Sequence, residues 1–251
     1  MPVRAITFDM WDTLVADDSD EPRRAALGLP TKADARRQLF VDAVLATAED
    51  IGETRALEAY DRATAAFRHA WKVEHHTPSV ADRLTVGFRL LGLGRNEPFD
   101  SMVEGFETME VEIPPDMAPG IRSCLDALAG KYPLGIISDA IVTPGRGLRE
   151  ILRGHGLLEY FSVFVFSDEA GAAKPARKVF DVASQGFGTA LDGLVHIGDR
   201  EANDVLGPHG VGAMSVLYTG CIDRGTDGTK ASAVCTHHDD LPGVIADLAS
   251  R

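Results

Sequence analysis

The sequence has few cysteines and no long apolar run. Three cysteines, Cys124, Cys221 and Cys235, are scattered among 251 residues without the spacing of a metal site. An odd, scattered set argues against a disulfide framework and predicts a reducing, cytoplasmic compartment. No apolar stretch approaches the roughly 18 residues of a membrane span, and the N-terminal residues show no signal-peptide pattern. We therefore expect a soluble protein without a membrane partner.

Positive charge is also scarce, since 25 Lys and Arg residues face 38 Asp and Glu residues and the net charge is −13. Nucleic-acid binding depends on Lys and Arg neutralising phosphates, so this balance argues against a nucleic-acid partner. There is no internal repeat and no low-complexity segment. A chain of this length can bury a substantial core, and a small molecule is the expected partner of a monomer or homodimer.

Short apolar segments recur along the chain at intervals. Most are almost continuously apolar, which is typical of parallel strands covered on both faces. Helical patterns separate the later segments, so the sequence predicts an α/β fold with a doubly wound parallel sheet. The expected strands are residues 3–8, 134–138, 163–167, 194–197 and 213–218.

More than a hundred residues separate the first two expected strands, and they contain no convincing strand. Apolar residues recur there at three- and four-residue steps, which indicates helices. Ser79 with Asp82 three residues later is typical of a helix N-cap. We therefore predict an inserted helical domain at residues 16–115, with the α/β core at 1–15 and 116–251. His237 and His238 lie in a polar stretch, and we expect both at the surface.

Polar residues follow four of the expected strands. Asp9 ends the first strand and Thr13 follows, Ser138 and Asp139 end the second, Lys174-Pro175 follows the third, and Asp199 and Asp204 follow the fourth. These segments, in this order and spacing, resemble the four motifs of the haloacid dehalogenase (HAD) superfamily. The resemblance extends from residue 3 to about 217, and members with an insertion at this point use it as a cap that selects substrate.

The resemblance implies a role for each motif. Asp9 would be the nucleophile that forms an aspartyl-phosphate. Asp9, Asp199, Asp204 and the backbone carbonyl of Trp11 would hold Mg²⁺, a cation that suits carboxylate sites next to phosphate. Ser138 and Lys174 would be catalytic and would bind the transferred group, with Thr13 and Asp139 as further substrate-binding residues. The implied activity is a magnesium-dependent phosphatase acting on a small phosphorylated metabolite.

Trp11 departs from the family pattern, because the usual residue there is the general acid/base aspartate. Indole can neither protonate a leaving group nor activate water, and losing such a group costs a factor of ~10²–10⁴. Asp12 either replaces the missing acid/base or braces the loop. Three other interpretations stay open: a dehalogenase, a phosphonate-cleaving enzyme using Lys32 or Lys72, and a catalytically weak protein that binds a phosphorylated ligand.

Overall fold

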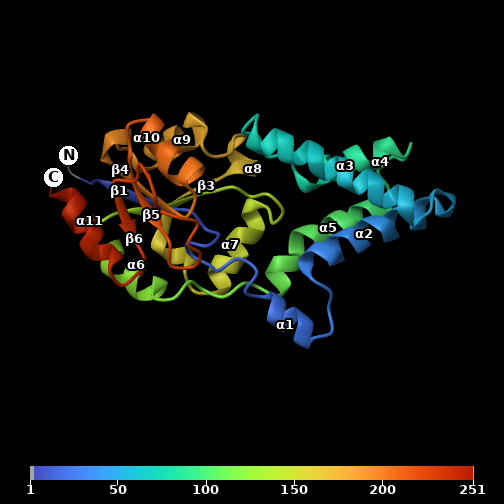
Figure 1. Ribbon diagram of the computed structural model, residues 1–251, viewed down its shortest axis with the longest axis horizontal. Coiled ribbons are helices and arrows are strands. Elements are labelled where there is room, and N and C mark those ends of the chain that lie inside the picture. Colours follow the sequence, from blue (N-terminus) through green and yellow to red (C-terminus); the bar gives the residue numbers. More distant parts are fainter. Residues whose placement is uncertain (1–2, 251) are drawn as a thin grey trace. The chain divides into compact units, whose positions relative to one another are not determined.

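The structure is a computed structural model that describes residues 3–250. The chain divides into two compact units, which are described separately here (Figure 1). The α/β unit contains the residues up to Asp17, Pro115–Asp139, and the residues from Leu152 on. The helical unit contains Asp18–Pro114 and Ala140–Ile151. The segment Ala140–Ile151 belongs to the helical unit, whereas the prediction from sequence placed it in the α/β core.

The α/β unit is built on a parallel six-stranded sheet in the order β3-β2-β1-β4-β5-β6. Five strands fall where the sequence predicts them, and the three-residue β6 is an addition. Within this unit, α6 and α11 lie on one side of the sheet and α9 and α10 on the other (Figure 1). The strands are β1 (Ala5–Phe8), β2 (Leu134–Ser138), β3 (Phe161–Phe166), β4 (Leu194–Gly198), β5 (Met214–Tyr218) and β6 (Ala233–Cys235).

Helices lie in the connections between strands from β1 to β5, as is usual for parallel pairing, and α11 follows the last strand, β6. The π-helix η4 (Glu201–Leu206) follows β4 directly, and α7 begins in the helical unit and ends in the α/β unit. The other helical elements are α6 (Ile121–Ala129), α7 (Gly145–Gly154), η2 (Leu158–Tyr160), α8 (Ser167–Ala170), α9 (Arg177–Phe187), η3 (Leu191–Gly193), α10 (Gly207–Gly210) and α11 (Leu241–Ala249).

Strands β1, β2 and β4 are buried along their whole length, which explains their nearly continuous apolar sequence. One surface expectation is wrong. His238 is buried, with its ring centroid 4.0 Å from that of Tyr218, whereas His237 is exposed. No helix among the described residues is long and apolar enough to cross a membrane.

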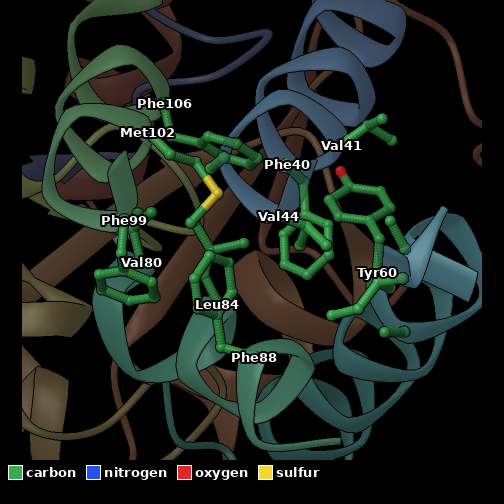
Figure 2. Close-up of a cluster of buried hydrophobic side chains, with 14 of the residues drawn as sticks. Phe40, Val41, Val44, Tyr60, Val80, Leu84, Phe88, Phe99, Met102 and Phe106 are labelled. Atoms are coloured by element: carbon green, nitrogen blue, oxygen red, sulfur yellow. The ribbon is translucent and has the colours of Figure 1, made fainter. Parts of the chain in front are cut away.

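The helical unit contains α1 (Glu21–Ala26), α2 (Lys32–Thr47), η1 (Glu49–Ile51), α3 (Glu53–Lys72), α4 (Val80–Leu90) and α5 (Glu97–Glu112). Helix α4 begins where the sequence predicts, because the Ser79 side chain accepts a hydrogen bond from the backbone N–H of Asp82. The apolar faces of α2 to α5 meet in one core. Figure 2 shows its aromatic centre, where Phe88 lies edge-on to both Phe40 and Phe99.

Candidate active site

Three aspartates leave the carboxyl ends of adjacent strands. Asp9 follows β1, Asp139 follows β2 and Asp199 follows β4, and β1 lies between the other two strands. The backbone N–H of Asp9 donates to the carbonyl of Ile197 at 2.8 Å, which fixes the end of β1 against β4. In open parallel sheets this edge is where ligands bind. The topology therefore brings together three of the residues that the sequence selected.

Asp9, Asp199 and Asp204 form a compact acidic group. One carboxylate oxygen from each lies within 4.8 Å of the others, and all three residues are buried. Oδ1 of Asp9 and Oδ1 of Asp199 accept no hydrogen bond from any described residue. Burial and the nearby Asp9 raise the pKa of Asp199 to about 6, against the opposing effect of Arg224. Buried carboxylates this close together repel one another when ionised, and a cation between them would relieve that repulsion.

Lys174 supplies one positive charge to this group. Its Nζ lies 2.6 Å from Oδ1 of Asp204 and 2.9 Å from Oδ1 of Asp9, the latter as an ion pair without hydrogen-bond angles. Burial opposes charging of the amine, but the carboxylates of Asp204, Asp9 and Asp139 outweigh it and raise the pKa of Lys174. Lys174 is therefore a fixed ammonium beside the candidate nucleophile.

A buried histidine supports the opposite side of Asp204. His196 Nε2 lies 3.1 Å from Oδ1 of Asp204, and its Nδ1 lies 2.9 Å from Oγ1 of Thr7. Burial lowers the pKa of His196, so the ring is neutral. A carboxylate can only accept, so Nε2 carries the proton and Thr7 donates to Nδ1. Sequence reasoning missed His196 because it occupies a position in an apolar strand.

Asp204 is fully engaged by these neighbours. Its Oδ1 receives Lys174 and His196, and its Oδ2 accepts the backbone N–H of Arg200 at 2.9 Å. Burial alone would raise the pKa of Asp204, but Lys174 and His196 hold it below its ordinary value. Asp204 therefore orients Lys174, whereas Asp9 and Asp199 each keep an oxygen available.

Arg224 is a second cation, which the sequence did not indicate. Its Nε donates to Oδ2 of Asp199 at 2.6 Å, and its Nη2 donates to Oδ2 of Asp12 at 2.8 Å. Oδ1 of Asp12 accepts the backbone N–H of Asp17 at 3.1 Å, and Asp12 has a φ of 54°. Both oxygens of Asp12 are thus bonded within the protein. Arg224 lies in a polar stretch between β5 and β6, where no pattern distinguishes it from its neighbours.

The remaining candidate residues differ in whether their side chains already have hydrogen-bond partners. Oγ of Ser138 and Oγ1 of Thr13 are buried, and neither atom has a hydrogen-bond partner among the described residues. The carboxylate of Asp139 accepts from the backbone N–H of Lys174 at 2.9 Å and from Asn203 at 3.3 Å. Trp11 is partly buried and forms an isolated bridge with Val15. Ser138 is therefore available to a ligand, while Asp139 holds the Lys174 loop.

The family description "haloacid dehalogenase-like hydrolase" matches residues 3–212 of the chain. The chain therefore belongs to the haloacid dehalogenase-like hydrolases, and the family and fold that the sequence predicted are confirmed. It is similar to pyrimidine 5'-nucleotidase YjjG of Escherichia coli, with 35% identity over 36% of this chain and 39% of the relative. It is also similar to glyceraldehyde 3-phosphate phosphatase of Pyrococcus abyssi, with 33% identity over 40% of this chain and 41% of the relative. The matched segments span only about two fifths of these curated relatives.

Solved structures agree on the fold. A HAD phosphatase from Thermococcus onnurineus has a TM-score of 0.65 at 22% identity and covers 97% of this chain and 98% of its own. The L-2-haloacid dehalogenase RSc1362 has a TM-score of 0.63 at 18% identity and covers 98% of this chain and 100% of its own. Phosphatases and dehalogenases thus share this fold, so the choice between the two reactions depends on the site.

Proposed function

We propose that this hydrolase is a magnesium-dependent phosphatase that acts on a small phosphorylated metabolite through an aspartyl-phosphate at Asp9. One observation carries the proposal. Next to the fixed ammonium of Lys174, buried oxygens of Asp9, Asp199 and Ser138 have no hydrogen-bond partner among the described residues. Buried polar atoms are normally bonded. Two of these oxygens suit a cation and the third suits an anion, which is the combination that a metal-assisted phosphate site needs.

The residues fit a hard divalent cation. Asp9 and Asp199 offer unbonded carboxylate oxygens within reach of each other, and the backbone carbonyl of Trp11 belongs to the same proposed set. Asp204 completes the acidic group and acts mainly through Lys174, because its own oxygens are occupied. When bound, Mg²⁺ would neutralise charge on the phosphate and on the nucleophile.

The chain's own residues supply the other requirements. An oxygen of Asp9 attacks phosphorus, the bond to the leaving oxygen breaks, and that oxygen departs with the electron pair. Water then attacks phosphorus and regenerates the Asp9 carboxylate while phosphate is released. Throughout, Lys174 offsets the charge of the transferred group and Ser138 donates to one of its oxygens. His196 and Asp204 hold the ammonium in place.

Because Trp11 cannot donate a proton as the usual aspartate does, protonation of the leaving group is the step with the least catalytic assistance. Both oxygens of Asp12 are occupied by Arg224 and Asp17, which supports a bracing role over an acid/base role. We therefore propose that the enzyme favours leaving groups of low pKa, such as acyl or aryl oxygens, which depart with little acid assistance.

Two further parts of the proposal concern the setting of the site. The helical unit acts as the cap that selects substrate, as the resemblance implies. The three cysteines are free thiols, which fits a reducing, cytoplasmic compartment. We propose a monomer or homodimer that binds neither nucleic acid nor membrane.

The phosphonate-cleaving alternative has little support. Its mechanism needs a neutral lysine amine, whereas Nζ of Lys32 lies 2.8 Å from Asp20 and 3.0 Å from Asp18. Burial opposes charging, but Glu110 and these aspartates raise the pKa of Lys32. Lys72 is exposed at the end of α3. Neither lysine is poised to form a Schiff base.

The dehalogenase alternative retains one specific observation, the aromatic Trp11 in place of the acid/base. The two reactions can be distinguished experimentally, because the proposed phosphatase needs a divalent cation and the dehalogenase does not. A purified sample should hydrolyse p-nitrophenyl phosphate with Mg²⁺, and activity should disappear with EDTA or in Asp9→Asn. Asp192→Asn, an exposed aspartate outside the acidic group, is the matched control. Metal-independent turnover of a 2-haloacid without phosphatase activity would favour the dehalogenase.

A further inference from the structure

The helical unit contains a buried arginine without a carboxylate partner. Arg83, in the first half of α4, is 8% exposed, and no carboxylate of the described chain lies within 4.0 Å of it. Buried charges are rarely left unpaired, because moving an ion out of water is costly. Of the other buried cations of this unit, Lys32 is paired with Asp18, Asp20 and Glu110, and Arg24 donates through Nε to the carbonyl of Pro30 at 3.2 Å. Unlike Nε of Arg24, Nε of Arg83 has no acceptor among the described residues.

The neighbours of Arg83 satisfy it only in part. Its Nη2 donates to Oγ1 of Thr64 at 3.1 Å, and its guanidinium carbon lies 4.7 Å from the ring centroid of Phe67. Its Nε is buried and donates to no described residue. Guanidinium nitrogens can only donate, so this N–H needs an acceptor that the residues around it do not provide.

A second arginine shows the same deficit. Nε of Arg36 is also buried without an acceptor, although its Nη2 donates to Glu110 at 2.8 Å. Burial lowers the pKa of Arg83, Tyr60 counteracts this, and the charges of Arg36 and exposed Arg68 lower it further. Arg36 and Arg83 thus each have a buried Nε–H donor without an acceptor among the described residues.

We propose that Arg83 forms a binding site for a small carboxylate or phosphate anion in the helical unit. An anion would supply an acceptor for the Nε–H group of Arg83 and neutralise the buried charge.

The first test measures binding without turnover. Thermal unfolding is followed in EDTA while succinate or inorganic phosphate is added. The wild-type midpoint should rise by about 5 °C or more when the anion reaches about a hundred times its Kd. Arg83→Met should lose this rise, whereas Arg89→Met, an exposed arginine on the same helix, should keep it. Any stabilisation by phosphate bound near Ser138 is the same in every variant. The difference in midpoint shift between variants therefore measures binding at Arg83.

The same variants separate a ligand site from a structural arginine. Without anion, Arg83→Met should be as stable as the wild type or more so, because an apolar side chain removes an unpaired buried charge. Arg83→Lys retains a cation and should respond only at about tenfold higher anion concentration, because the planar donor fork is lost. This second variant keeps the test valid if Arg83→Met fails to fold. A wild-type midpoint that ignores both anions, or Arg83→Met responding like wild type, would overturn the proposal.

Discussion

Arg224 and Asp12 are joined by a hydrogen bond of 2.8 Å between Nη2 and Oδ2, although 212 residues separate them in the sequence. The same guanidinium holds Asp199 through Nε at 2.6 Å. One side chain therefore ties the loop after β1 to the carboxylate after β4. This arrangement holds Asp12, whose φ is 54°, while Oδ1 of Asp199 accepts no hydrogen bond from the described residues and lies 3.9 Å from Nε of Arg200.

This pair predicts the outcome of Asp12→Asn. The substitution should reduce turnover of aryl and alkyl phosphates by the same factor, at most about fivefold, because a partly exposed ion pair contributes about 1 kcal/mol or less. Arg224→Gln should act in the same direction, whereas Lys230→Gln on the same loop should have no effect. A selective loss of ~10²-fold or more on alkyl phosphates alone would instead identify Asp12 as the general acid.

Trp11→Asp should restore the missing acid/base. Alkoxide leaving groups need a proton more than phenolates of low pKa, so turnover of alkyl phosphates should rise by about tenfold or more relative to aryl phosphates. The backbone carbonyl of residue 11 is retained, so the proposed metal set is unchanged. Steady-state kinetics on a matched alkyl and aryl pair provide the measurement. An equal change for both substrates would show that protonation does not limit turnover.

Gly198→Ala should disable the site through its neighbours. A Cβ at this position would lie 2.3 Å from Cγ of Asp204, which is too close for any real contact. The displaced Asp204 would move the ammonium of Lys174 away from Asp9, and a misplacement of about 1 Å can cost about 10²-fold in rate. Gly130→Ala, where an added Cβ meets no atom within 4 Å, is the control. A Gly198→Ala variant with ordinary turnover would contradict this prediction.

The sequence predicted the parts of the fold that depend on local pattern. Apolar runs identified five strands, and the spacing of apolar residues identified the inserted helices. Asp9, Ser138, Lys174 and Asp199 could be selected as candidate site residues because each lies at or after the C-terminal end of an expected strand. The short β6 and the transfer of Ala140–Ile151 to the helical unit were missed, because both depend on distant packing.

The site residues that sequence missed are set by distant contacts. Arg224 lies in a polar loop, and only its bonds to Asp12 and Asp199 distinguish it from neighbouring residues. His196 looks like one more residue of a buried strand until Thr7 and Asp204 are seen on its two nitrogens. Arg83 has no signal in the sequence at all, since an arginine in an amphipathic helix is ordinarily exposed.

His238 has a geometry that predicts how stability depends on pH. It is 1% exposed, its Nδ1 lies 3.2 Å from the carbonyl of Pro119, and its Nε2 has no partner among the described residues. Burial lowers its pKa from 6.5 to about 4, although Pro119 and Asp239 act in the opposite direction. The folded protein therefore holds this ring neutral at a pH where the unfolded chain already protonates it.

The sign follows from proton binding. Between about pH 6.5 and pH 4 the unfolded state binds more protons at His238, so the free energy of unfolding falls as the pH falls. A shift from 6.5 to about 4 corresponds to a loss of about 3 kcal/mol at most. Urea unfolding of wild type and His238→Gln at several pH values isolates this contribution, because every other titrating group is common to both proteins.

At pH 7.5, His238→Gln should be less stable than wild type, because the contact with Tyr218 is weakened. As the pH falls to 4, the difference should shrink by up to about 3 kcal/mol, because only the wild type must then protonate a buried ring or unfold. His237→Gln, which changes the exposed neighbouring residue, is the control for effects of the substitution itself. A His238→Gln difference that stays constant or grows on acidification would show that His238 titrates as it does in the unfolded chain.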